Sequence, residues 1–264
     1  MSQQPLLSIK DASLAFGEHT LWTGLDLEVQ PHEFIAVIGS NGSGKSSLLK
    51  AILGQQELTG GQILMQGKPI ASRKVGYIPQ SRAVDPASTL RACDLIGLGL
   101  DGHRFGIPLP SRAKRQAVAR TLEAIGASEL AKTPITKLSG GELQRMRVGQ
   151  AVISEPDLIL ADEPLSALDL HQQQVVSALI DDQRRAHNAA VLFVTHDVNP
   201  ILDLVDRVLY LANGKFRIGT ADEVLRSEVL SELYGTQVDV VRNQGRIVVL
   251  GTQDHDHHPE EEWK

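Results

Sequence analysis

One short segment of this chain combines glycine, lysine and serine residues at a spacing that suits phosphate binding. Residues 39–46 read GSNGSGKS and fit the pattern G-x-x-x-x-G-K-[ST]. Glycines let backbone N–H groups surround phosphate oxygens without steric conflict from Cβ atoms. In such a loop the lysine reaches the outer phosphates and the last hydroxyl binds Mg²⁺. We therefore expect a nucleotide site with Lys45 on the phosphates and Ser46 on Mg²⁺, in preference to a chance glycine-rich turn.

Two adjacent carboxylates, Asp162 and Glu163, follow the continuous apolar run Leu158–Ala161. Such a run predicts a strand buried on both faces, and the carboxyl end of a parallel strand lies where ligands bind. Alone, two acids at such a place form an ordinary solvated turn or a helix cap. Beside a phosphate-binding loop they favour catalysis, with Asp162 holding Mg²⁺ and Glu163 orienting the water that attacks the γ-phosphate.

A third segment, residues 138–145, predicts a helix that starts at two glycines. Ser139 and Glu142 have the spacing of a capping box, in which each side chain bonds the other residue's backbone N–H. Capping does not account for Gly140 and Gly141, because glycine lowers helix stability. Exposed N–H groups at this helix start suit a second phosphate-binding surface. One ATP needs only one phosphate-binding loop, so a second surface predicts a site shared by two chains.

The rest of the chain alternates between expected strands and helices. Leu25–Val29 has the period of a half-buried strand, while Phe34–Ile38 and Val191–Val194 are continuous apolar runs. We expect helices at 47–53, 90–100, 113–125, 142–154, 172–185 and 221–234. Strands alternating with helices predict an α/β fold with a mainly parallel sheet. We expect one domain over residues 1–250, with a helical subdomain inserted at about 81–155, and a His-rich, acidic, disordered tail over 251–264.

Composition narrows the classes of function. The chain of 264 residues has a formal net charge of −6, which argues against a generic nucleic-acid-binding protein. Its single cysteine, Cys93, excludes an internal disulfide framework and a CxxC metal site. No segment approaches the roughly 18 apolar residues that span a bilayer, and the first residues lack the pattern of a secretory signal. We expect a cytoplasmic chain that another protein holds if it works at a membrane.

Taken in order, these segments resemble the ATP-binding subunit of ABC transporters over residues 6–235. The matching motifs are the Walker A loop at 39–46, the Q-loop at Gln80, the signature at 138–142, the Walker B strand at 158–163, the D-loop at 166–169 and the switch histidine at 194–197. The resemblance implies the P-loop NTPase fold of an ABC ATPase cassette. That fold has a mainly parallel core sheet, an N-terminal antiparallel β part and an inserted helical subdomain.

The resemblance also implies ATP hydrolysis by two copies paired head to tail around two ATP molecules. Each ATP is then bound by Phe16, Gly39, Ser40, Asn41, Gly42, Ser43, Gly44, Lys45, Ser46 and Ser47 of one chain. The signature residues of the other chain, Ser139, Gly140, Gly141 and Glu142, contact the same ATP. The implied catalytic residues are Glu163, His196, Gln80 and Lys45, the Mg²⁺ ligands are Ser46, Gln80 and Asp162, and Asp169 crosses the dimer interface. Phe16 replaces the commoner tyrosine and Glu142 the commoner glutamine, and neither change removes a catalytic group.

The family's organisation implies partners in a membrane. With one phosphate-binding loop and no span of its own, the chain is expected to dock on separate permease subunits at the inner face of the cell membrane. The docking surface is expected within 81–137, above all at 85–100. An extracytoplasmic metal-binding protein is expected in the same system, and nucleic acid is not an expected partner.

The cargo is expected to be a divalent metal ion, zinc or manganese. Residues 231–236, 238–241 and 247–250 resemble the cassettes of zinc and manganese importers. His255, Asp256, His257 and His258 in the tail suit these metals, although a flexible polar tail with incidental histidines explains them equally well. Two alternatives stay open, an iron-chelate or haem importer and a soluble ABC ATPase in iron–sulfur cluster assembly. The presence of Glu163, Gln80 and His196 argues against a regulator that does not hydrolyse ATP.

Overall fold

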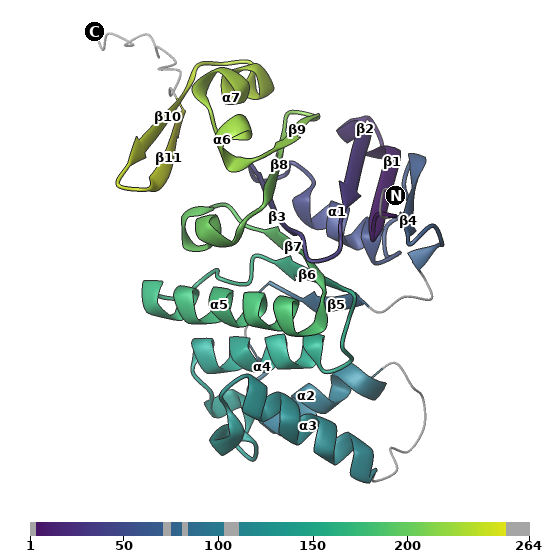
Figure 1. Ribbon diagram of the computed structural model, residues 1–264, viewed down its shortest axis with the longest axis vertical. Helices are drawn as coiled ribbons and strands as arrows, with labels where there is room; N and C mark the ends of the chain where they lie inside the picture. The colour runs from purple at the N-terminus through teal and green to yellow at the C-terminus, as the bar shows by residue number, and fades with distance from the viewer. Residues whose placement is uncertain (1–3, 71–74, 81–83, 103–110, 252–264) are drawn as a thin grey trace, which may run out of the picture.

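A computed structural model describes residues 4–70, 75–80, 84–102 and 111–251 of the chain (Figure 1). The expected tail with His255, Asp256, His257 and His258 lies outside the described residues, as does most of the loop before residue 111. Gly251, placed at the start of that tail by the sequence, is instead the last residue of a strand. Within the described part of the chain, every helix is too short or too polar to cross a bilayer.

A six-stranded sheet forms the centre of the molecule (Figure 1). Its strands, in spatial order, are β5 (Val75–Ile78), β6 (Leu158–Asp162), β7 (Ala190–Val194), β3 (Phe34–Gly39), β8 (Arg207–Ala212) and β9 (Lys215–Gly219). The first five are parallel, and β9 pairs antiparallel with β8. Because parallel strands share one direction, the loops after β5, β6, β7 and β3 leave from the same edge of the sheet. That edge receives most of the expected site residues.

The two faces of this sheet pack against different layers. Phe34, Ala36 and Ile38 of β3 belong to a core cluster shared with α4 (Gly140–Val152) and α5 (Leu170–His187). The intervening Ile35 and Val37 pack on the other face with α1 (Lys45–Ile52) and an antiparallel sheet. All residues of β3, β6 and β7 are buried, which explains why these strands are continuous apolar runs.

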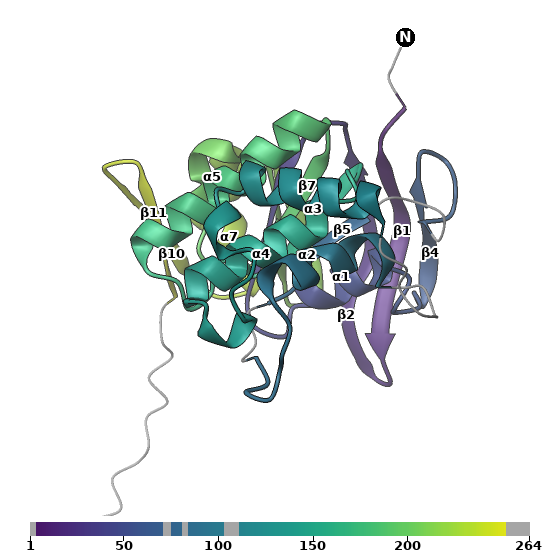
Figure 2. The ribbon, with the colours of Figure 1, turned by 90° about the horizontal axis from the view of Figure 1, so that it is seen from below.

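The antiparallel sheet and the helical region lie in different parts of the molecule. The sheet has the order β2 (His19–Val29), β1 (Leu7–Phe16) and β4 (Gly60–Met65). In the chain, α2 (Ala92–Asp101), α3 (Arg112–Ala124) and the 3₁₀ turns Ser128–Leu130 and Ile135–Lys137 come between β5 and α4. Figure 1 shows α2, α3 and α4 together below α5, and Figure 2 shows β1 and β4 on the opposite side from the C-terminal hairpin. The predicted α/β fold, with an antiparallel part and an inserted helical region, is confirmed.

The C-terminal part differs from the prediction of one helix at 221–234, which is wrong. The chain forms α6 (Ala221–Val224) and α7 (Ser227–Tyr234), separated by Leu225 with ψ 69° and by an extended Arg226. The break places the Ser227 hydroxyl at 2.9 Å from the backbone N–H of Val240, which donates to it. Val240 lies in the hairpin of β10 (Val238–Asn243) and β11 (Arg246–Gly251), and a short 3₁₀ helix, η4 (Asn199–Leu204), precedes β8.

Candidate functional site

The glycine-rich loop runs from the end of β3 into α1, as the sequence predicts. Two of its glycines have positive φ angles and no space for a side chain. A Cβ on Gly39, at φ 155°, would lie 2.0 Å from the carbonyl oxygen of Leu211, and one on Gly44, at φ 92°, would lie 2.7 Å from Nε1 of Trp22. Gly44 is the N-cap of α1, and no side chain of the described residues caps that helix. The first N–H groups of α1 therefore have no capping side chain and can serve an anion.

Lys45 lies buried at the base of this loop and bonds the loop itself. Its Nζ donates to the carbonyl oxygens of Gly39 at 2.9 Å and Ser40 at 2.8 Å. Burial lowers the pKa of the Lys45 ammonium, and the charges of Glu163 and Asp162 offset part of that shift. These contacts hold a cation at the place where the outer phosphates of a nucleotide are expected.

The two carboxylates after β6 face different partners. Ser46 donates its hydroxyl to Oδ1 of Asp162 at 2.9 Å, and Tyr77 donates to Oδ2 of the same carboxylate at 3.3 Å. Gln80 donates from Nε2 to Oε2 of Glu163 at 3.1 Å. Strand β5 and the residues just after it therefore contact both carboxylates, Tyr77 reaching the first and Gln80 the second.

Glu163 also has an unusual backbone. Its φ of 46° lies in the left-handed region, which costs a residue with a side chain about 1–2 kcal/mol. Its N–H donates to the carbonyl oxygen of Val194 at 3.0 Å, which fixes this turn against the end of β7. Backbone strain at a carboxylate beside a phosphate-type loop is typical of a functional position.

One cavity of about 440 Å³ brings these groups together with an aromatic side chain. Phe16, half exposed at the end of β1, lines it, and so do Asn41, Gly42, Gly44, Lys45, Ser46, Ser47 and Glu163. Sequence reasoning missed His19 and Leu21, which also line it, because both come from β2 rather than from a recognised motif.

His196 follows β7 but does not line this cavity. It is exposed, and it lines a separate cavity of about 350 Å³ with Asp197, Asn199, Tyr210 and Ile247. Since β7 lies between β6 and β3, the histidine still leaves the sheet from the same edge as Glu163 and the glycine-rich loop.

The start of α4 forms the capping box that its spacing predicts. The Ser139 hydroxyl accepts from the N–H of Glu142 at 3.3 Å, and Oε2 of Glu142 accepts from the N–H of Ser139 at 2.8 Å. These bonds lower the pKa of Glu142. A Cβ on Gly141 would lie 2.0 Å from Oε1 of Gln172 on α5, whereas one on Gly140 would have its nearest neighbour at 3.8 Å. Packing against Gln172 therefore explains Gly141, and no such contact explains Gly140.

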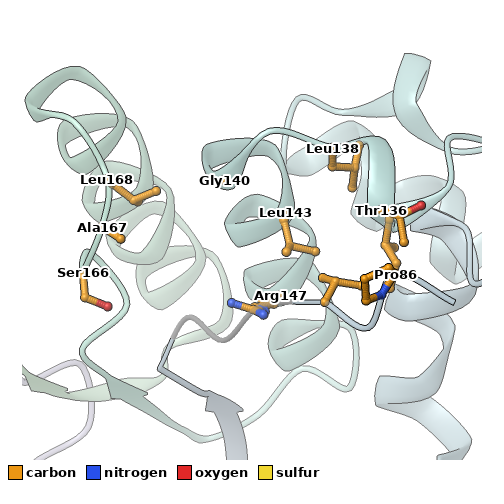
Figure 3. Close-up of a pocket in the computed structure, with 11 residues that line it drawn as sticks. Pro86, Thr136, Leu138, Gly140, Leu143, Arg147, Ser166, Ala167 and Leu168 are labelled. Atoms are coloured by element: carbon orange, nitrogen blue, oxygen red, sulfur yellow. The ribbon is translucent and has the colours of Figure 1, made fainter. Parts of the chain in front are cut away.

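The start of α4 and the glycine-rich loop line different cavities of one chain. A cavity of about 510 Å³ is lined by Gly140, Leu143 and Arg147 of α4 and by the loop Ser166–Leu168. Figure 3 shows Ser166, Ala167 and Leu168 on one side of this cavity and Leu143 and Arg147 on the other. Asp169, exposed, caps α5 by accepting from the N–H of Gln172 at 2.8 Å.

The donor set at the loop fits Mg²⁺. This hard cation prefers oxygen ligands and is held by one or two carboxylates together with substrate phosphates. The hydroxyl of Ser46 and the carboxylate of Asp162 are hydrogen-bonded to each other and lie directly beside the phosphate-type loop. Both oxygens therefore face the place where phosphates are expected.

Three contacts of the site were not foreseen from the sequence, those of Tyr77, Trp22 and Gln172. Tyr77 has a partial signal, because it is the one side chain with a hydroxyl in the short strand before Gln80. Trp22 is fully buried, its Nε1 has no hydrogen-bond partner among the described residues, and it packs under Gly44. Gln172 belongs to a polar run on α5, and nothing in that run signals a contact with Gly141.

The sequence also matches a known family. A family model described as ABC transporter matches residues 22–166, more than half of the chain. This chain belongs to the ABC transporter family. Like the ATP-binding proteins of that family, it is an ATPase whose activity is coupled to transport.

Curated relatives within the ABC family have different cargoes in their names. The zinc import ATP-binding protein ZnuC of Haemophilus influenzae is 30% identical over 90% of this chain and 83% of its own length. The hemin import ATP-binding protein HmuV of Pseudomonas aeruginosa is 36% identical over 91% of this chain and 97% of its own length. The molybdate import ATP-binding protein MolC of Haemophilus influenzae is 31% identical over 86% of this chain and 87% of its own length.

Solved structures support the ABC ATPase fold. A chain from an inward-facing transporter described as of the metal-chelate type superposes with a TM-score of 0.81 and 27% identity, over 94% of this chain and 98% of that one. A nucleotide-free ATP-binding cassette of an ABC transporter superposes with a TM-score of 0.75 over 86% of this chain and 95% of that one; at 21% identity it speaks for the fold alone.

Proposed function

We propose that this chain hydrolyses ATP to drive import of a divalent metal ion, zinc or manganese, through a separate membrane permease. One observation above all supports the proposed hydrolysis site. Lys45, Ser46 and Glu163 line one cavity at a single edge of the sheet, and Ser46 donates a hydrogen bond to Asp162 there. The proposed cargo is supported by the similarity to the zinc import protein and to the metal-chelate type transporter.

In the proposed mechanism, the site residues bind the nucleotide and its Mg²⁺ or orient the attacking water. The uncapped start of α1 and the ammonium of Lys45 bind the phosphates. Ser46 and Asp162 hold Mg²⁺, with Gln80 as a further ligand. When bound, Mg²⁺ neutralises negative charge that develops on the phosphate oxygens. Glu163 orients the water, while Gln80 bonds the Oε2 atom of the same carboxylate. Phe16 stacks on the adenine and His196 contacts the γ-phosphate.

We propose that a second copy of the chain completes each site. Within one chain, Gly140 and the glycine-rich loop line separate cavities. In the part of the chain that the structure describes, Gly140 has no neighbour close enough to require glycine, so it stays available for approach by another molecule. In a head-to-tail pair, Ser139, Gly140, Gly141 and Glu142 of one copy face the ATP of the other. The exposed Asp169 then lies in the interface.

The proposed partners follow from the transport reaction. Permease subunits supply the path through the membrane, and they hold this chain at the inner face of the cell membrane. An extracytoplasmic metal-binding protein delivers the cargo. The curated relatives are named as import ATP-binding proteins, which supports the inward direction.

A haem importer is the second candidate, because HmuV is 36% identical and its length is covered to 97%. Elemental analysis of whole cells tests the two. A strain that lacks this chain is grown under chelation with zinc, manganese, iron or haem added back. The strain is complemented either with the wild-type chain or with Glu163→Gln as the matched inactive control.

Metal import predicts selective loss of cellular zinc or manganese, restored by the wild-type chain and not by Glu163→Gln. Loss of haem uptake with normal zinc and manganese assigns the chain to haem import instead. Unchanged zinc, manganese, iron and haem uptake contradicts both cargoes while leaving the ATPase assignment in place.

A further inference from the structure

The loop that carries His196 is tied to the C-terminal hairpin by one side chain. Nδ2 of Asn199 donates to the carbonyl oxygen of Ile247 at 2.9 Å, and Oδ1 of Asn199 accepts from the N–H of Ile247 at 2.8 Å. The amide therefore pairs with both backbone groups of one residue in β11, as a neighbouring strand would. Ile247 is buried in the same core cluster as the helix-covered face of the sheet.

A second set of bonds joins Asn199 to the residue after the histidine. Both the backbone N–H and Nδ2 of Asn199 donate to Oδ1 of Asp197, at 2.9 and 2.7 Å. Asp197 in turn exchanges two bonds with Thr195, whose hydroxyl donates to the Asp197 carbonyl at 2.7 Å and accepts from its N–H at 3.1 Å. His196 lies between these two residues, so its backbone is fixed on both sides.

The hairpin is itself anchored to the body of the domain. The N–H groups of Val238 and Val240 each donate at 2.9 Å, to the hydroxyls of Ser231 and Ser227 on α7. Arg242 forms an ion pair with Asp222 at 2.5 Å. These contacts hold the hairpin against α6 and α7, and Asn199 joins it to the histidine loop. Figure 1 shows β10 and β11 at the end of the molecule opposite the helical region, beside α7.

We infer that Asn199 is a positioning residue for ATP hydrolysis, which holds His196 in its working place by clamping the histidine loop to β11. The C-terminal hairpin then helps to position the loop that carries His196. This inference rests on the role proposed for His196 at the γ-phosphate. Asn199 lies three residues after the histidine and acts through the loop, with no contact to nucleotide required.

The test is steady-state hydrolysis by the full chain bearing Asn199→Ala. We expect kcat to fall on the order of 10-fold, because a small misplacement of a positioned group has large effects on rate. The KM for ATP is expected to stay close to that of the wild type, since the glycine-rich loop is untouched. A chain that ends at residue 251 is expected to match the wild type.

Asn213→Gly is the matched control. Asn213 also bonds a backbone carbonyl, that of Tyr234 at 2.8 Å, but it lies after β8 and does not line the cavity that His196 lines. Its φ of 48° suits glycine. This variant is expected to keep the wild-type kcat, which separates the clamp from a general loss of amide contacts in the C-terminal part.

The double variant His196→Ala/Asn199→Ala decides whether Asn199 acts through the histidine. We expect it to hydrolyse ATP no more slowly than His196→Ala alone. A further loss of the same factor would overturn the inference, and so would a normal kcat in Asn199→Ala. If His196→Ala itself retains the wild-type rate, the proposed role of His196 fails first. The two failures are therefore distinguishable.

Discussion

Two helices of the described structure, α1 and α4, start at glycines, and they differ in whether side chains cap their first N–H groups. At α1 the N-cap is Gly44, with no side-chain cap, and the only cation in the loop bonds carbonyls of the loop itself. At α4 the N-cap is Ser139, and a capping box engages the N–H groups of Ser139 and Glu142, which leaves Gly140 and Gly141 outside it. The first start is open to a phosphate within one chain. The second is stabilised by its cap without a ligand, so it can stay exposed until another copy binds.

This contrast explains the distribution of strain and packing. The α1 loop keeps its form through glycines that no other residue can replace, pressed against Leu211 and Trp22. At α4 the capping bonds stabilise the helix, and only Gly141 is constrained by a neighbour.

Glu163→Gln is expected to give the largest effect, because the carboxylate next to the α1 loop is the proposed water-orienting group. The amide keeps the shape but not the charge, so turnover is expected to fall by roughly 10²–10⁴-fold while ATP binding persists. The measurement is phosphate release together with equilibrium binding of ATP. Near-normal phosphate release would remove Glu163 from the proposed mechanism.

The charge of Lys45 provides a test by pH. Burial lowers the pKa of its ammonium, so the proton is lost at a lower pH than from an ordinary lysine. Phosphate binding at the α1 loop needs the charged form, and ATP affinity is therefore expected to weaken as the pH rises, before an exposed lysine would titrate. ATP binding is measured across the alkaline range. Lys45→Arg, which stays charged, is expected to bind with no such dependence on pH, and an equal decline in both would contradict this explanation.

Gly141→Ala tests whether packing or phosphate contact requires glycine at the α4 start. The added Cβ meets the end of the Gln172 side chain, which must turn aside, so stability is expected to fall by about 1 kcal/mol, at the low end of the cost of overpacking. In Gly141→Ala/Gln172→Ala the clash is gone, and thermal stability is expected to recover. ATP hydrolysis that stays low in this stable double variant supports a contact with ATP of the other copy. Full recovery of hydrolysis would mean that glycine is needed at position 141 only for packing against Gln172.

Ser139→Ala is expected to have the smallest effect on the free chain. It removes one capping bond of α4, and caps of this kind contribute about 1 kcal/mol. Glu142→Gln is the control, because glutamine also completes a capping box. Thermal unfolding without nucleotide should show a lower midpoint for the first and little change for the second. Equal midpoints for all three proteins would mean that the cap adds nothing to stability.

The sequence predicts the start of α1 more completely than it predicts the start of α4. The α1 loop, β3 and β6 follow from local patterns, because buried parallel strands are continuous apolar runs and phosphate-type loops need glycine. The capping box at α4 is equally local. The contact between Gln172 and Gly141 joins two helices and leaves no local signal. The break at Leu225 and the Asn199 clamp depend on where the C-terminal hairpin packs, which no short pattern encodes.

The central claim is that a second copy completes the site at the α1 loop. Sedimentation of Glu163→Gln with and without ATP tests it most directly. We predict one chain without ATP, a pair with ATP, and no pair when Lys45→Ala or Gly140→Asp is added, although Gly140→Asp still binds ATP. A Glu163→Gln protein that binds ATP and sediments as a single chain would contradict the claim, and so would a pair that forms equally well with Gly140→Asp.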